Sequence, residues 1–189
     1  NSKLNIKNIN INPSRTGILK ILKIMGVKIF LKKIKKYKGE KTADIYIESS
    51  DSIKSIKCPS NLNSASIDEF LLIFLVAAKA KGVSYFKDLS ELDQKESPRL
   101  KWGSKILNKI GIKTETTKHS IKIFGNPELK VTKEIEIKKF LKDHRVFMAS
   151  VIASITFGGP MWYIHDRDSI NTSFPSFLKK ISEFGVKIN

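Results

Sequence analysis

The sequence predicts an α/β fold in which repeated units place apolar helices inside and strands outside. Two sequence phrases support this prediction. A proline, an amphipathic segment, a glycine and a strand-like segment occur three times, and an apolar segment with a glycine and a strand-like segment occurs twice between these copies. Gly26 and Gly111 occupy equivalent positions 85 residues apart, and Asp68 and Asp143 are 75 apart. Because no interdomain linker is visible, we expect residues 1–189 to form a single domain.

The first phrase runs from proline to glycine over residues 13–26, 98–111 and 175–185. In its first copy, apolar residues recur at i, i+3, i+4 and i+7 from Ile18 to Met25, which aligns them on one helix face. Proline is favoured in the first turn of a helix, and glycine is favoured just past the end. Each copy therefore predicts an amphipathic helix and, after the glycine, a strand.

The second phrase opens at Ser66 and again at Asp143. Ser66 and Glu69 have the spacing of a capping box, in which the serine hydroxyl accepts from the Glu69 amide and the glutamate reaches back. An apolar run follows to Ala78, and Asp143 is the expected N-cap of a second run to Thr156. Both runs are apolar on most sides, so we expect these helices to be buried in the middle of the domain.

Strands fill most of the remaining sequence. Residues 43–48 alternate in polarity, and residues 83–86 and 162–164 follow the glycines of the two apolar helices. Residues 112–124 predict a hairpin. The segment 39–63 has few apolar residues outside its strand, and we expect it to be exposed.

The chain is strongly basic, with 35 Lys and Arg against 18 Asp and Glu and a net charge of +17. Nucleic acid, an anionic membrane and small anionic substrates all suit such a charge. A nucleic-acid surface concentrates its bases and uses arginine for bidentate contacts, whereas only four bases here are arginines and the lysines are scattered. We interpret the charge as a lysine-rich surface and expect neither nucleic acid nor a membrane as a partner.

The cysteine and histidine content argues against disulfides and metals. Cys58 is the single cysteine, which indicates a reducing, cytoplasmic location. The three histidines are far apart and no glycine-rich phosphate loop is present, so we expect neither a metal nor a cofactor. The longest uncharged run, residues 146–164, is interrupted by glycines and predicts a helix, a turn and a strand instead of a membrane span. Since the chain begins at Asn1, we expect a fragment of a longer protein.

Charged residues gather at one predicted helix start. Lys95 and Glu96 precede the helix, and Arg99 lies in its first turn. We expect Ser97 to cap this helix and Pro98 to start it. Because the helix dipole is positive at this end, a cation there is unfavourable unless an anion binds beside it. The alternative is a solvated charged turn without a ligand.

Two further predicted helix starts also carry charged residues. His144 and Arg145 follow the expected N-cap Asp143, and Asp68 lies in the first turn of the earlier apolar helix. The cations suit the binding of a substrate that carries both a phosphate and a carboxylate. Asp68 and Glu96 suit catalysis in which one carboxyl acts as the base and the other as the acid. For Asp68, helix-end electrostatics alone is the alternative explanation.

Five strings, taken in order, resemble the C-terminal half of the 5-enolpyruvylshikimate-3-phosphate (EPSP) synthases. They are Ile67-Asp68-Glu69, Ala80-Lys81-Gly82, Glu91-Leu92 with Lys95-Glu96-Ser97-Pro98-Arg99, Asp143-His144-Arg145-Val146-Phe147-Met148, and Thr172-Ser173-Phe174-Pro175. The resemblance covers essentially the whole chain. It implies an enolpyruvyl-transferase-type inverse α/β fold of βαβαββ units in two domains. This chain would be the returning C-terminal segment, which forms most of one domain, and the other domain is absent.

The resemblance also implies an activity, the transfer of the enolpyruvyl (1-carboxyvinyl) group of phosphoenolpyruvate to the 5-hydroxyl of shikimate 3-phosphate with release of phosphate. In the shikimate pathway this step leads to chorismate and the aromatic amino acids, and the family is the target of glyphosate. Asp68 matches the residue that binds the shikimate ring and is the favoured base. Glu96 matches the residue implicated in protonating the phosphoenolpyruvate methylene.

Further roles follow from the same resemblance. Lys95, Arg99 and Arg145 match the bases that hold phosphoenolpyruvate, and Lys95 also faces the shikimate hydroxyl. We expect His144 and Thr172 to support the site, although some members have a lysine at the position of Thr172. Because half of the substrate site lies in the absent domain, we expect no turnover from this chain alone.

Two alternative functions remain open. A UDP-N-acetylglucosamine enolpyruvyl transferase would share the fold and the base, but it typically uses a cysteine acid from the other domain, and the string Lys95-Glu96-Ser97 favours the shikimate enzyme. A basic nucleic-acid-binding module would show strongly salt-dependent binding.

Overall fold

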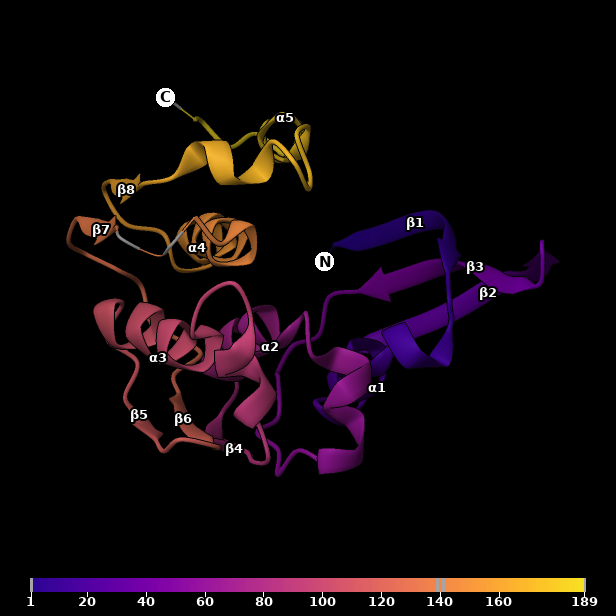
Figure 1. The fold of residues 1–189 in the computed structure, drawn as a ribbon, viewed down its shortest axis with the longest axis horizontal. Helices are drawn as coiled ribbons and strands as arrows, with labels where there is room; N and C mark the ends of the chain where they lie inside the picture. The colour runs from indigo at the N-terminus through magenta and orange to yellow at the C-terminus, as the bar shows by residue number, and fades with distance from the viewer. Residues whose placement is uncertain (1, 139, 141, 189) are drawn as a thin grey trace.

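The computed structural model describes residues 2–138, 140 and 142–188 of the chain. Its three sheets lie on the outside, and helices α1 to α4 lie between them (Figure 1). The predicted α/β fold with buried helices and outer sheets is therefore confirmed.

The first sheet contains β1 (Lys3–Asn10), β2 (Lys28–Tyr37) and β3 (Glu40–Glu48) in the antiparallel order β1-β3-β2. The short 3-10 helix η1 (Pro13–Arg15) and helix α1 (Gly17–Ile24) connect its first two strands. The strand predicted over residues 43–48 is confirmed and lies at the centre of this sheet. The sequence does not predict β1, because the alternation begun by Leu4 and Ile6 is broken by a register shift before Ile9.

The second sheet contains β4 (Gly82–Phe86), β5 (Thr114–Thr116) and β6 (Ile121–Gly125) in the order β4-β6-β5. Helix α2 (Phe70–Ala78) leads into β4, and helix α3 (Arg99–Lys109) leads into the predicted hairpin of β5 and β6, which is confirmed. This order matches that of the first sheet strand for strand, with α1 and α3 in equivalent places. The sequence repeat therefore corresponds to a structural repeat.

The third sheet has two parallel strands, β7 (Ile135–Ile137) and β8 (Trp162–Ile164), joined by helix α4 (His144–Phe157). Helix α5 (Phe177–Ser182) follows. The strand predicted after Gly185 is wrong, because residues 186–188 pair with no strand of the described chain. No helix in the described residues is both long and apolar enough to cross a membrane.

Helices α2 and α4 are buried, as predicted. Seven of the nine residues of α2 are buried, and Phe70 and Phe74 pack against Phe86 of β4 with ring centroids 5.4 to 6.1 Å apart. Burial of such aromatic side chains supplies much of the hydrophobic stabilisation of a core. The N-terminal ends of these helices, near which Asp68 and Arg145 lie, are thereby held in fixed positions.

The predicted capping box at Ser66 is wrong. Ser66 belongs to a 3-10 turn (Ser64–Ser66), its main-chain oxygen accepts from the Glu69 amide at 2.9 Å, and α2 begins only at Phe70. The Ser66 hydroxyl is buried against Gly17, so closely that a Cβ added to this glycine would overlap it, and it has no hydrogen-bond partner among the described residues. The close approach of the two chain segments takes the hydroxyl away from the helix start.

The expectation that the segment 39–63 is exposed outside its strand is wrong at Ile56 and Cys58, which are buried. The segment forms parallel bridges from Lys54 to Lys81 and from Lys57 to Tyr85 of β4. Burial raises the pKa of the Cys58 thiol to about 11, so the thiol is protonated at neutral pH. A buried, protonated thiol is not a nucleophile.

Candidate functional site

Four chain segments meet at Asp68, which lies in the turn before α2. The Arg99 Nη1 atom donates to Asp68 Oδ1 at 3.3 Å. Arg15 Nη1 donates to Asp68 Oδ2 at 3.2 Å, and Arg145 Nη2 lies 3.3 Å from the same oxygen. Arg99 and Arg145 are the first and second residues of α3 and α4, and Arg15 ends η1. The convergence of charged residues at helix starts is therefore a property of the folded chain.

Arg99 is a buried cation whose donors are taken up by carboxylates. Its Nε donates to Asp143 Oδ2 at 2.9 Å, its Nη2 lies 3.4 Å from Asp143 Oδ1, and its Nη2 also contacts Glu96. The side chain is 2% exposed. Paired acids thus offset the unfavourable interaction between this arginine and the helix dipole.

Asp143 links the starts of α3 and α4. It is fully buried, and its Oδ1 accepts from the Arg145 amide at 2.9 Å, which confirms the predicted N-cap. Its Oδ2 also accepts from the Ser97 hydroxyl at 2.8 Å. Burial by itself raises the pKa of Asp143, but the hydrogen bonds from Arg99 and Ser97 outweigh burial and hold the pKa below its usual value.

The expected capping of α3 by Ser97 is wrong, because the Ser97 hydroxyl is committed to Asp143. A free main-chain amide in the first turn of α3 finds its acceptor in Asp93 instead, whose Oδ1 accepts from the Leu100 amide at 3.0 Å. Pro98 occupies the N-cap position, directly before the first helical residue.

Arg145 fixes the turn that carries Asp68. Its Nη1 donates to the main-chain oxygen of Asp68 at 3.0 Å and lies 4.0 Å from Glu69 Oε1. Burial raises the pKa of Glu69, and Arg145 opposes this rise without cancelling it. The Arg145 side chain remains 31% exposed, so a ligand can reach it while it holds the turn.

Of the remaining predicted site residues, only Glu96 makes a described side-chain contact with this cluster. Glu96 contacts Arg99 yet keeps 55% of its side chain exposed, and Lys95 beside it is exposed with no carboxylate within 4.0 Å among the described residues. His144 is the first residue of α4 and is half-buried. Thr172 is exposed in the turn after η5 (Arg167–Ile170), a segment that packs on α4, and it makes no described contact with the cluster.

Sequence reasoning assigns Glu69 only to a capping box, and it misses two further members of the cluster. It assigns Arg15 only to the proline phrase, and Asp143 only to a helix cap. The roles of Arg15 and Asp143 depend on contacts between residues far apart in the sequence. Arg15 and Asp68 are separated by 53 positions, and Arg99 and Asp143 by 44. No local spacing rule reports contacts of this length, although an unpaired acid at a helix start beside a basic residue is a weak signal.

The cluster is electrically balanced and has a defined chemical capacity. It contains four basic and four acidic side chains, namely Arg15, Lys95, Arg99, Arg145, Asp68, Glu69, Glu96 and Asp143. An incoming carboxylate or phosphate can replace Glu96 on Arg99 and bind the exposed part of Arg145. Such an exchange would release Glu96 from Arg99, while Asp68 would keep its contacts to the arginines.

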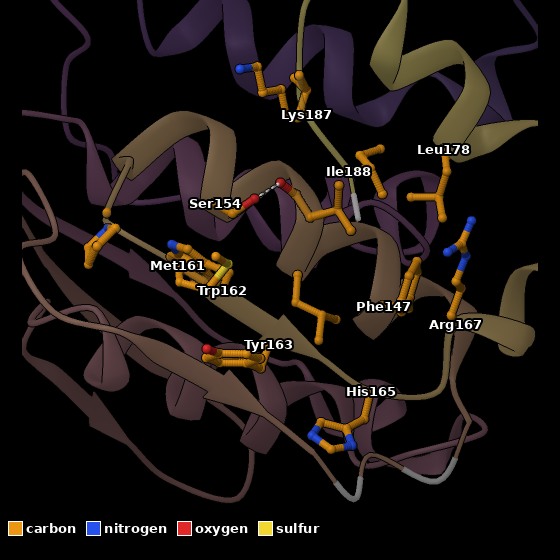
Figure 2. A pocket seen from close by; sticks show the side chains of 15 residues that line it. Phe147, Ser154, Met161, Trp162, Tyr163, His165, Arg167, Leu178, Lys187 and Ile188 are labelled. Carbon is orange, nitrogen blue, oxygen red and sulfur yellow. Dashed lines mark hydrogen bonds between the residues drawn. The ribbon is translucent and has the colours of Figure 1, made fainter.

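A cavity of about 670 Å³ lies apart from this cluster (Figure 2). It is bordered by α4, β8, α5 and residues 186–188 and opens to solvent, and Phe147, Met161 and Leu178 contribute to its mainly apolar lining. None of the eight side chains of the cluster lines it. The cavity and the charged cluster are therefore separate features of the described chain.

Comparison with known proteins finds relatives over nearly the whole chain. The family described as EPSP synthase (3-phosphoshikimate 1-carboxyvinyltransferase) matches residues 1–181. A 3-phosphoshikimate 1-carboxyvinyltransferase of Ruthia magnifica subsp. Calyptogena magnifica is 38% identical over 186 residues, which are 98% of this chain and 42% of the relative. The chain thus spans less than half of the length of its curated relatives.

Solved structures agree with the sequence comparison. An EPSP synthase from Acinetobacter baumannii is 31% identical, with a TM-score of 0.86 over 96% of this chain and 41% of the other. The enolpyruvyl transferase NikO from Streptomyces tendae has a TM-score of 0.70 over 100% of this chain and 40% of its own. At 13% identity, this second likeness concerns the fold alone.

Proposed function

The chain belongs to the EPSP synthase family, and from this premise we propose that it is part of a 3-phosphoshikimate 1-carboxyvinyltransferase. Such an enzyme moves the enolpyruvyl group of phosphoenolpyruvate to the 5-hydroxyl of shikimate 3-phosphate and releases phosphate. The observation that carries the proposal is the set of three arginines around Asp68, with Glu96 and Lys95 at its open edge. This set provides one wall of a cleft for two anionic substrates.

We propose that residues 1–189 form most of one domain and that the rest of a longer protein, called here the complete protein, provides the other. The third sheet supports this division. β1 and β4 each pair with the second strand of a hairpin, whereas β8, in the equivalent place, pairs only with β7 among the described strands. The apolar cavity of Figure 2 lies between β8 and residues 186–188, where such a strand belongs.

In the proposed reaction Asp68 takes the proton from the 5-hydroxyl as the oxygen attacks the enol carbon of phosphoenolpyruvate. Glu96 gives a proton to the methylene carbon, so the addition produces a tetrahedral intermediate without a free carbanion. Glu96 then takes a proton back from the methyl group as phosphate leaves with the proton held by Asp68, which restores the carbon–carbon double bond and both carboxyls. Asp68 is fixed in direction by its contacts to three arginines, and Glu96 lies at the exposed edge of the cluster, where a substrate can reach it.

Lys95, Arg99 and Arg145 are proposed to bind the carboxylate and phosphate of phosphoenolpyruvate. Fixed cations stabilise negative charge that shifts toward the leaving phosphate, and they do so without reorganising during the reaction. His144 and Thr172 are proposed to support the site from the α4 side. We also propose a cytoplasmic location and no metal or organic cofactor.

Phosphate release by the complete protein tests the proposal. Phosphoenolpyruvate with shikimate 3-phosphate is expected to give multiple turnovers, phosphoenolpyruvate with UDP-N-acetylglucosamine none, and the 189-residue chain alone none with either acceptor. Turnover with the UDP-sugar and not with shikimate 3-phosphate would assign the protein to the sister activity instead. Turnover by the isolated chain would show that one wall of the cleft suffices.

A further inference from the structure

Asp68 is the proposed base, and its two oxygens are held unequally. Oδ1 accepts from Arg99 Nη1 at 3.3 Å, while Oδ2 is shared by Arg15 Nη1 at 3.2 Å and Arg145 Nη2 at 3.3 Å. A base must present one oxygen to the substrate hydroxyl in a constant direction. The contacts on Oδ2 therefore decide how firmly the carboxylate plane is fixed.

Arg15 is mounted on a rigid turn. The Asn12 side-chain oxygen accepts from the Ser14 amide at 3.0 Å and from its hydroxyl at 2.9 Å. The main-chain oxygen of Asn12 accepts from the Arg15 amide at 2.9 Å and from the Thr16 hydroxyl at 3.2 Å. The turn packs on the Ser64–Ser66 segment, directly before the segment that carries Asp68. The backbone of Arg15 is thus held before its side chain reaches the carboxylate.

The exposure of the three guanidinium groups separates their tasks. The Arg99 side chain is 2% exposed and belongs to the core, Arg145 is 31% exposed and also holds the turn, and Arg15 is 74% exposed. An exposed ion pair contributes little to stability. The fold therefore does not require the contact between Arg15 and Asp68.

We propose that Arg15, which lies in the first repeat of the chain, is a positioning residue that fixes the direction of the Asp68 carboxylate. This inference rests on the proposed function, in which Asp68 is the base. Without Arg15, Oδ2 keeps only the contact to Arg145, whose guanidinium is needed for substrate. The groups facing Asp68 are then Arg99 from α3, Arg145 from α4 and the neighbouring acids Glu69 and Glu96.

Kinetics of the complete protein test this role. Arg15→Gln is expected to lower kcat about tenfold, the order of one charge-assisted hydrogen bond at a partly exposed site, with KM for both substrates unchanged within twofold. Arg15→Lys keeps the charge and is expected to restore at least half of the activity. Lys33→Gln is the matched control, because Lys33 is 67% exposed and pairs with the mostly buried Asp44 in the first sheet, away from the site.

The Asp68 side chain provides a readout that does not need turnover. Three-bond NMR couplings that report χ1 of Asp68 are expected to indicate one rotamer in the wild-type chain and in Lys33→Gln, and averaging in Arg15→Gln. A wild-type complete protein without turnover would refute the proposed function, and these couplings would still decide the role of Arg15. An Arg15→Gln protein with wild-type kcat, equal losses in Arg15→Gln and Arg15→Lys, or an unchanged Asp68 rotamer would overturn the proposal.

Discussion

Asp68→Asn in the complete protein is expected to lower kcat by roughly 10²- to 10⁴-fold, the usual contribution of a positioned general base. Asparagine has nearly the same shape, and its single amide oxygen can still accept from Arg15 or from Arg99, but the amide cannot take a proton from the shikimate hydroxyl. KM for phosphoenolpyruvate is expected to change by less than about fivefold, because its proposed ligands remain. Steady-state phosphate release measures both constants.

Asp44→Asn controls for loss of a mostly buried carboxylate. Asp44 is 10% exposed on its side chain, pairs with Lys33 at 3.6 Å and lies in the first sheet, so its replacement removes the same charge without touching the site. We expect this variant to keep wild-type kcat. An Asp68→Asn protein that retains a tenth or more of wild-type kcat would contradict the assignment of Asp68 as the base.

Asp143→Ala is expected to lower the free energy of unfolding of the 189-residue chain by about 3–5 kcal/mol, because it leaves the buried Arg99 without its fully buried partner. It also removes the N-cap of α4, which contributes about 1 kcal/mol within that range. Asp143→Asn keeps an acceptor for the Arg145 amide, so a smaller loss is expected. Urea denaturation at pH 7 provides the comparison.

Asp168→Ala is the control for this prediction. Its carboxylate is 59% exposed and pairs with Lys142, so the free energy of unfolding is expected to change by less than about 0.5 kcal/mol. If Asp143→Ala cost no more than Asp168→Ala, the buried network would not hold the helix starts together.

The stability that Asp143 contributes has a definite pH dependence. Its folded-state pKa lies below the ordinary value of 3.8, so the ionised form is favoured by folding and the contribution is complete above that pH. It is lost as pH falls through the lower, folded-state pKa. The difference in unfolding free energy between wild type and Asp143→Asn should be constant from pH 7 to 5 and shrink below about pH 4. Glu69, with its raised pKa, is present in both proteins and cancels in the difference.

The repeated sequence phrases predict most of the fold, because each helix and strand carries its own apolar period and glycine. Glycines 26, 111 and 158 end helices with positive φ, as the phrases require. The same local rules fail where a distant segment competes for a side chain. Ser66 packs on Gly17 and Ser97 binds Asp143, so neither caps the helix that follows it.

The candidate site is predicted in part. Charged residues at helix starts identify Asp68, Glu96, Arg99 and Arg145 as a group, and the fold brings these four together. The sequence cannot assign the buried partner of Arg99 or the contribution of Arg15, because both depend on how separate repeats pack. The sequence also cannot indicate that each of the three guanidinium nitrogens of Arg99 contacts a carboxylate, from Asp143, Asp68 or Glu96.

The binding of phosphoenolpyruvate alone to the complete protein, without the acceptor that would allow turnover, tests most directly whether this cluster is one wall of the substrate cleft. Isothermal titration is expected to give an affinity about 100-fold weaker for Arg145→Gln than for wild type, since the variant loses a charge-assisted contact to the ligand. Arg167→Gln removes an exposed arginine outside the cluster and should bind as wild type does. Equal affinity of Arg145→Gln and wild type would contradict the account.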